Sequence, residues 1–224
     1  MTAFANDEER FAWIRQNVYV PVVSDILDEL GHKHQAMHPR LRPLDPDNCT
    51  IVGRARTLRW METDYIVEED PYGNEIDAID SLRPGDVAVH STDYSGTIAP
   101  WGELMTTVCK VRGAVGCICD SMVRDCKRIM EMEFPVFYQG IGPLDSKGRG
   151  WVVAYDVPIR CGEVLVHPGD LIYSDFDGVI VVPKDVEDDV LQRAMEKVGK
   201  ENLTRKELKE GKTLREVYNK YRVL

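Results

Sequence analysis

The chain has 224 residues, of which 43% are apolar, and it carries 28 Lys and Arg residues against 38 Asp and Glu residues, for a net charge of -10. This is enough for one sizeable core, and no Pro/Ser-rich linker divides the chain, so we expect a single domain over residues 1–224. The basic residues are dispersed, which disfavours nucleic acid as a partner, and no apolar run approaches the ~18 residues needed to span a bilayer, so we expect a soluble, cytoplasmic protein that binds no membrane.

The first third of the chain predicts two short helices, a strand and an acidic loop. The spacing of apolar residues over 7–17 suits a helix, and a second helix is expected to begin near Ser24 or Asp25 and to end before Gly31. Residues 50–60 alternate as a strand does. The acidic stretch 63–80 contains Pro and Gly at its middle, and we interpret it as a loop that enters a short helix, with the acidic run forming a solvated rim.

From residue 86 the pattern becomes α/β. Strands and helices are expected to alternate at 86–91, 102–113, 114–120, 124–133 and 134–140, with Leu104, Val108 and Val111 on one face of the first of these helices. Successive strands with tight turns follow at 151–161, 163–170 and 171–183, and the charged segment from Lys184 onward is expected to be helical. The sequence therefore predicts a mixed α/β fold built in layers.

The start of the helix at 102–113 is a candidate anion site. It follows the irregular segment "STDYSGTIAPWG", so the backbone amides of Gly102, Glu103, Leu104 and Met105 include unpaired donors of a helix N-terminus.

A second group of polar side chains follows the apolar strand at 114–120. This strand places Asp120 at its carboxyl end, where α/β sheets usually hold ligands, and Arg124 and Asp125 come at the turn into the next helix. The guanidinium of Arg124 matches a carboxylate, whereas Asp125 and Glu103 supply the hard oxygens that a magnesium-like ion prefers. Together these groups suit a 2-oxo acid, although an Arg-Asp pair at a helix start is also typical of a helix cap and a surface ion pair.

Three segments, "WGELMTTVCKVRGAVGCICDSMVRD", "FPVFYQGIGPLDSKGRG" and "PGDLIYSDFDGVIVVP", carry a resemblance to the RraA-like family. That family includes class II 4-hydroxy-4-methyl-2-oxoglutarate/4-carboxy-4-hydroxy-2-oxoadipate aldolases, oxaloacetate decarboxylases and the regulator of ribonuclease E activity. The resemblance implies a swivelling β/β/α layered domain with a core at about 20–185 and a C-terminal helical segment at about 184–222. It also implies a homotrimer or homohexamer with sites between subunits.

The resemblance further implies a divalent-metal-dependent carbon–carbon lyase with Mg²⁺ or Mn²⁺ as cofactor. Such an enzyme cleaves a 4-hydroxy-2-oxo acid or decarboxylates an oxaloacetate-like acid through a metal-stabilised enolate, and it releases pyruvate or a related 2-oxo acid. By motif position, Arg124 and Asp125 are the catalytic pair: Arg124 binds the substrate and orients the water that protonates the enolate, and Asp125 ligates the metal directly. Glu103, and Glu201 from a neighbouring subunit, hold the metal through water. The amides of residues 102–105 clamp the substrate carboxylate.

The sequence departs from the family at three places. Arg128 occupies the position where family aldolases tend to have an acid, Ser121 and Met122 change the expected pocket wall, and the insertion "VEEDPYGNE" lacks a clear match. These departures bear on the substrate, because Arg128 could recognise a second carboxylate.

Other candidate functions are weaker. One branch of the family suggests a non-catalytic regulator that binds a ribonuclease or helicase. The histidines of "GHKHQAMH" fit no usual metal-ligand spacing, and "SDFDG" at 174–178 is interpreted as a turn. No glycine-rich dinucleotide or phosphate-binding signature precedes a helix.

Overall fold

The computed structural model describes residues 4–223, and its main feature is one eight-stranded mixed sheet. The strand order is β1-β5-β4-β3-β2-β9-β10, with β6 also paired to β2. The strands are β1 (Arg42–Pro43), β2 (Ile51–Glu62), β3 (Asp86–Ser91), β4 (Gly116–Val123), β5 (Val136–Ile141), β6 (Gly150–Tyr155), β9 (Leu171–Asp175) and β10 (Gly178–Val182). The four strands β2 to β5 run parallel to one another, whereas β1, β6, β9 and β10 pair antiparallel with their neighbours.

Two further layers cover this sheet. The small sheet of β7 (Ile159–Cys161) and β8 (Val164–Val166) shares one apolar cluster with residues of the main sheet, and α3 (Asn74–Asp80), α4 (Glu103–Arg112) and α5 (Cys126–Glu131) contribute to the clusters on the other side. Almost every side chain of β3 and β4 is buried, because these strands lie between the two layers. The β/β/α layered α/β fold expected from the sequence is confirmed.

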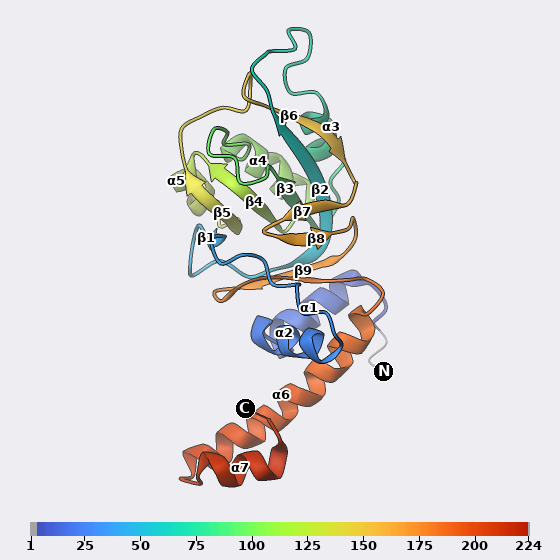
Figure 1. Ribbon diagram of the computed structural model, residues 1–224, viewed down its shortest axis with the longest axis vertical. Helices are drawn as coiled ribbons and strands as arrows, with labels where there is room; N and C mark the ends of the chain where they lie inside the picture. Colours follow the sequence, from blue (N-terminus) through green and yellow to red (C-terminus); the bar gives the residue numbers. More distant parts are fainter. Residues whose placement is uncertain (1–3, 224) are drawn as a thin grey trace.

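The remaining helices pack below the end of the sheet that β9 and β10 form (Figure 1). They are α1 (Asp7–Asn17), α2 (Val20–Glu29) and α6 (Glu187–Lys209), and α7 (Leu214–Tyr221) folds back on the far end of α6. The 23 residues of α6 span about 34 Å, and its second half extends away from the sheet as an arm that carries α7 at its tip (Figure 1). The predicted C-terminal helices are therefore present.

Two helix predictions need correction. The second helix begins at Val20 rather than near Ser24, because Pro21 occupies its first turn and the Val20 amide donates to Asp175 Oδ2 at 3.0 Å, a cap supplied from a distant strand. In α4, Leu104 and Val111 are exposed, at 73% and 84%, instead of facing the core.

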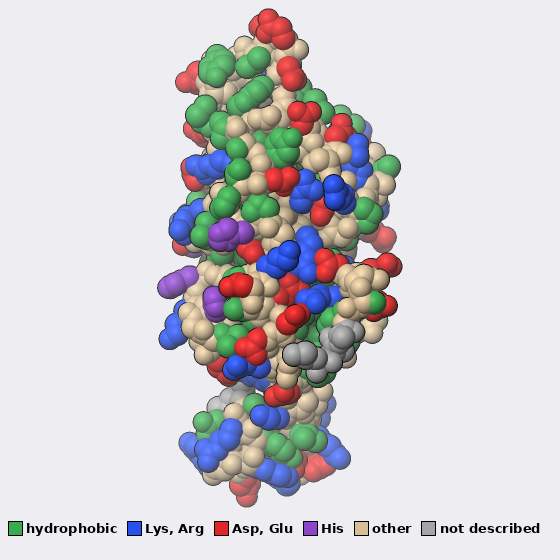
Figure 2. Space-filling model, turned by 90° about the vertical axis from the view of Figure 1, so that its right-hand side faces the viewer, with side chains coloured by type: hydrophobic (Ala, Val, Ile, Leu, Met, Phe, Trp, Pro, Cys, Tyr) green, Lys and Arg blue, Asp and Glu red, His purple; other side chains and the backbone are tan. Residues whose placement is uncertain are grey.

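Charge is mixed over the surface. On the face shown in Figure 2, Lys and Arg side chains alternate with Asp and Glu side chains. Within residues 4–223 no helix is both long enough and apolar enough to cross a membrane. The segment 174–178 forms the turn between β9 and β10, as predicted.

Candidate functional site

The loop before α4 is fastened to the end of β4. Ser121 Oγ donates to the backbone oxygens of Ser95 at 2.7 Å and Ile98 at 2.8 Å, and Trp101 pairs with Val123 as an isolated parallel bridge. The Arg124 amide then donates to the Trp101 oxygen at 2.9 Å. These bonds place the start of α4 directly beside the start of α5.

Gly102 and Asp125 are in close contact across this junction. A Cβ atom built on Gly102 would lie 2.8 Å from Asp125 Oδ2 and 3.1 Å from Arg124 Cγ, so only glycine leaves room for both side chains. The Glu103 amide donates to the same Asp125 Oδ2 at 3.3 Å. Asp125 itself has a positive φ of 57° and caps α5 without a side-chain hydrogen bond, which leaves its carboxylate directed at the junction.

Arg124 lies between two carboxylates. Its Nε is 4.0 Å from Asp125 Oδ2, and its Nη2 is 3.4 Å from Asp145 Oδ1 in the loop after β5. Tyr72, just before α3, donates its hydroxyl to Asp145 Oδ2 at 2.9 Å. Burial, followed by this hydrogen bond to Asp145, raises the pKa of Tyr72, so the phenol stays protonated and keeps donating. The chain of contacts from Tyr72 through Asp145 fixes the guanidinium.

These groups surround a cavity of about 210 Å³, a size that suits a small acid. Its walls combine the start of α4 and the Arg124–Asp125 pair with α3 and the loop after β5, and they include Tyr72, Glu75, Gly102, Leu104, Met105, Arg124, Asp125, Asp145 and Ser146. Glu75 is only 3% exposed, and Ser146 Oγ donates to its Oε2 at 3.3 Å. Burial, with Asp145 adding to it, raises the pKa of Glu75 to about 8.

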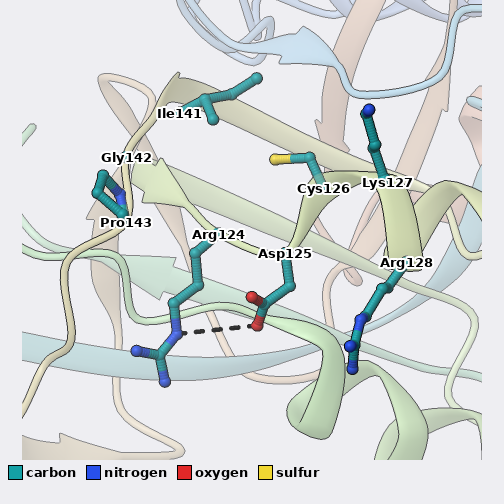
Figure 3. A pocket seen from close by; sticks show the side chains of 8 residues that line it. All are labelled: Arg124, Asp125, Cys126, Lys127, Arg128, Ile141, Gly142 and Pro143. Atoms are coloured by element: carbon teal, nitrogen blue, oxygen red, sulfur yellow. Dashed lines mark ion pairs between the residues drawn. The ribbon is translucent and has the colours of Figure 1, made fainter.

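A wider, open depression of about 620 Å³ lies on the other side of Arg124 and Asp125. Figure 3 shows the side chains of Arg124, Asp125 and Arg128 directed to one side, with Lys127 on the opposite side. Arg128 Nη1 is 4.0 Å from Glu103 Oε2, so Arg128 approaches the pair of helix starts from α5. This side of the site is therefore rich in cations.

The structure brings most of the predicted residues together. Gly102, Leu104, Met105, Arg124 and Asp125 all line the smaller cavity, and the Glu103 amide contacts Asp125. One of the helix-start amides expected to be free for an anion is thus used by Asp125.

Glu201 does not lie with them. It is in the second half of α6 beside Arg205, 4.0 Å from that guanidinium, and lines a separate depression with Tyr19. Its place in a neighbouring subunit's site stays a prediction.

Two expectations about β4 were wrong. Asp120 does not face the cavity: the strand continues to Val123, and Asp120 is buried and accepts from the Thr92 amide at 2.6 Å and the Thr92 hydroxyl at 2.8 Å. Burial raises the pKa of Asp120 to about 6. Ser121 is fully buried in the loop contacts described above and is not a pocket wall.

The donor set fits a divalent ion of the magnesium type. Within residues 4–223 no three His, Cys, Asp or Glu side chains gather closely enough to form a metal cage. Mg²⁺ keeps several waters and needs only one or two protein carboxylates, which Asp125, cradled against Gly102, and the nearby Glu103 can supply.

Residues 20–181 match the RraA-like family, described as Aldolase/RraA. The chain belongs to the RraA-like family. A relative from Halalkalibacterium halodurans, provisionally named 4-hydroxy-4-methyl-2-oxoglutarate aldolase, is 34% identical over 78% of this chain and 77% of its own length.

Solved structures share the RraA-like fold. Streptomyces coelicolor RraAS2, described as an unusual member of the RNase ES inhibitor RraA protein family, is 27% identical with a TM-score of 0.79, over 91% of this chain and 98% of that one. A structure described among novel cellulases from microbes of the gut ecosystem is 29% identical with a TM-score of 0.83, over 90% and 89% of the two chains.

Sequence reasoning missed the wall of the cavity opposite α4. Tyr72 and Glu75 belong to the acidic stretch that was interpreted as a solvated rim, and Asp145 and Ser146 were given no role. One signal was available: Glu75 precedes Ala78 and Ile79 by three and four residues, so it shares their helix face, and both of these are buried.

Proposed function

We propose that this protein is a divalent-metal-dependent carbon–carbon lyase acting on a 2-oxo acid, by retro-aldol cleavage of a 4-hydroxy-2-oxo acid, by decarboxylation of an oxaloacetate-like acid, or by both. The observation that carries the proposal is the junction of Gly102, Arg124 and Asp125 at two helix starts around one small cavity. The aldolase name of the Halalkalibacterium halodurans relative supports the same reaction class.

In this proposal, different residues of the chain bind the substrate and the metal. Arg124, held by Asp145, offers its guanidinium to the carboxylate or keto oxygen of the substrate. The remaining amides at the start of α4 bind the same carboxylate and benefit from the positive end of the helix dipole. Asp125 would hold Mg²⁺ or Mn²⁺, and Glu103 would contribute a second carboxylate to the outer shell of that site. When bound, the ion supplies a Lewis acid for the negative charge that develops on the keto oxygen.

The assembly is proposed to be a homotrimer or homohexamer in which Glu201 of one subunit completes the outer shell of the metal site of the next. The projecting arm of α6 and α7 supports this, because Glu201 lies on the part of α6 that extends away from its own sheet (Figure 1). A molar mass measured by light scattering would test the oligomer.

The cation-rich depression indicates the substrate class. Arg128 could hold a second carboxylate, whereas the smaller cavity, with the Asp145 carboxylate on its wall, would repel one. We therefore propose a dicarboxylic or tricarboxylic 2-oxo acid whose distal carboxylate points toward α5.

The test measures pyruvate release with lactate dehydrogenase from oxaloacetate and from 4-hydroxy-2-oxo acids, with and without Mg²⁺ or Mn²⁺. Asp125→Asn is expected to lower turnover at least 10²-fold and to weaken Mn²⁺ binding in calorimetry, because the amide loses the charge that attracts the ion. Asp77→Asn, an exposed acid on α3, serves as the matched control and is expected to behave as wild type. Absence of metal-dependent turnover of every substrate by the wild-type protein would refute the proposal.

A regulatory role is the second candidate, supported by the likeness to Streptomyces coelicolor RraAS2. Binding to a purified ribonuclease or helicase that is unchanged by Arg124→Ala, together with absence of lyase activity, would favour it.

A further inference from the structure

Glu75 is a buried acid that the proposed function does not yet use. It lies in the first turn of α3, is 3% exposed and lines the same cavity as Arg124 and Asp125. The cavity is only about 210 Å³ in volume, so a small molecule held by Arg124 inside it lies beside the wall to which Glu75 belongs.

Glu75 differs from the other carboxylates of the cavity in its hydrogen-bond and ion-pair partners. The neighbouring Asp145 has two partners, the Arg124 guanidinium at 3.4 Å and the Tyr72 hydroxyl at 2.9 Å. Within residues 4–223 no Lys, Arg or His forms an ion pair with Glu75, and its side-chain hydrogen bond is the one from Ser146. The charged groups that line the cavity together with Glu75 are thus Arg124, Asp125 and Asp145.

We propose that Glu75, in place of a water oriented by Arg124, is the catalytic acid–base residue that exchanges a proton with C3 of the 2-oxo acid bound by Arg124. Cleavage of the C3–C4 bond leaves its electron pair as the enolate of pyruvate, and the Glu75 carboxyl gives its proton to C3, forming the methyl group. Glu75 becomes a carboxylate and regains a proton from water. In decarboxylation this is the one proton consumed per turnover, and in retro-aldol cleavage it is balanced by the proton lost from the C4 hydroxyl.

This inference rests on the proposed lyase function and goes beyond it by naming the proton donor. Two carboxyl groups in one cavity with different environments are the usual arrangement for dividing acid and base roles. Since the pKa of Glu75 is raised to about 8 by burial, it is mostly protonated at pH 7 and ready to donate.

The reverse step gives a direct assay, which is the exchange of pyruvate methyl protons for deuterium in D₂O. Proton NMR follows this exchange in a buffer that contains Mg²⁺ and no Mn²⁺. Here the ionised Glu75 removes a proton from C3, so the exchange rate of the wild type is expected to rise with pH and to level off above about 8. Glu75→Gln keeps the shape and the contact with Ser146 but cannot accept a proton. It is expected to exchange at least 10²-fold more slowly, without the rise, while its affinity for oxalate stays within about threefold of wild type.

Two further variants separate catalysis from structure. Glu75→Asp retains a carboxyl, so its exchange rate is expected to rise with pH, whereas the exchange rate of Glu75→Gln is not. Ser146→Ala removes the hydrogen bond that lowers the pKa of Glu75, so the rise of its exchange rate is expected at higher pH than in wild type, and this test holds even if Glu75→Gln fails to fold.

The outcomes distinguish the two proposals. Exchange by Glu75→Gln at the wild-type rate and with the wild-type pH profile would overturn the role of Glu75 alone, as would an unchanged profile in Ser146→Ala. Absence of both exchange and turnover in the wild type would overturn the lyase function and the Glu75 proposal with it.

Discussion

Glu75 also makes a measurable contribution to stability, with a sign that follows from its burial. Its ordinary pKa is 4.5, and in the folded protein burial raises it to about 8. Between these values the folded state keeps a proton that the unfolded state has released, so the free energy of unfolding falls as the pH rises. Over this span of about 3.5 pH units, at about 1.36 kcal/mol each, the loss amounts to about 5 kcal/mol.

Glu75→Gln removes this titration while keeping the volume of the side chain. Relative to wild type, the free energy of unfolding of the variant is expected to increase by about 4 kcal/mol between pH 5 and pH 8 and to change little above pH 8.5. All other titrating groups are common to both proteins and cancel in the difference.

Urea denaturation followed by tryptophan fluorescence, at fixed protein concentration and at several pH values from 5 to 9, measures this difference. Asp77→Asn, an exposed acid on the same helix, is the matched control, and its difference from wild type is expected to stay below about 1 kcal/mol at every pH. A difference between Glu75→Gln and wild type that does not vary with pH would show that Glu75 titrates normally and would refute the reasoning.

Two other substitutions test the geometry of the site and a buried ion pair at the start of α6. Gly102→Ala places a Cβ 2.8 Å from Asp125 Oδ2 and is expected to lower turnover about 10²-fold by displacing the carboxylate; the control Gly96→Ala, whose Cβ meets nothing within 4 Å, is expected to match wild type in the same assay. Glu187→Ala removes a 2% exposed carboxylate that lies 2.5 Å from Arg54, and it is expected to cost about 3 kcal/mol in urea denaturation, whereas the exposed Asp188→Ala is expected to cost less than about 1 kcal/mol. A larger loss from Asp188→Ala than from Glu187→Ala would contradict the assignment of the buried ion pair.

Where the local pattern decides the structure, the predictions were accurate. The first helix was expected at 7–17 and α1 occupies Asp7–Asn17, and the strand expected at 86–91 is β3. Apolar periodicity and capping residues act between neighbours in the chain, so they can be read without the fold. The start of α2 was wrong for the complementary reason, since its cap comes from Asp175, 155 residues away.

The sequence by itself determined most of the strands and helices, the family, and the adjacency of Arg124 and Asp125 beside a helix start. It did not predict β1, and the single strand expected at 151–161 is divided into β6 and β7. Only the tertiary structure decided that Asp120 turns into the core and that Glu75 and Asp145 close the cavity. Tyr72 and Asp145 are 73 residues apart, and Glu75 and Ser146 are 71 apart. The burial and charge of such a cavity arise from segments that meet only after the sheet has formed, and no pattern within either segment specifies the other.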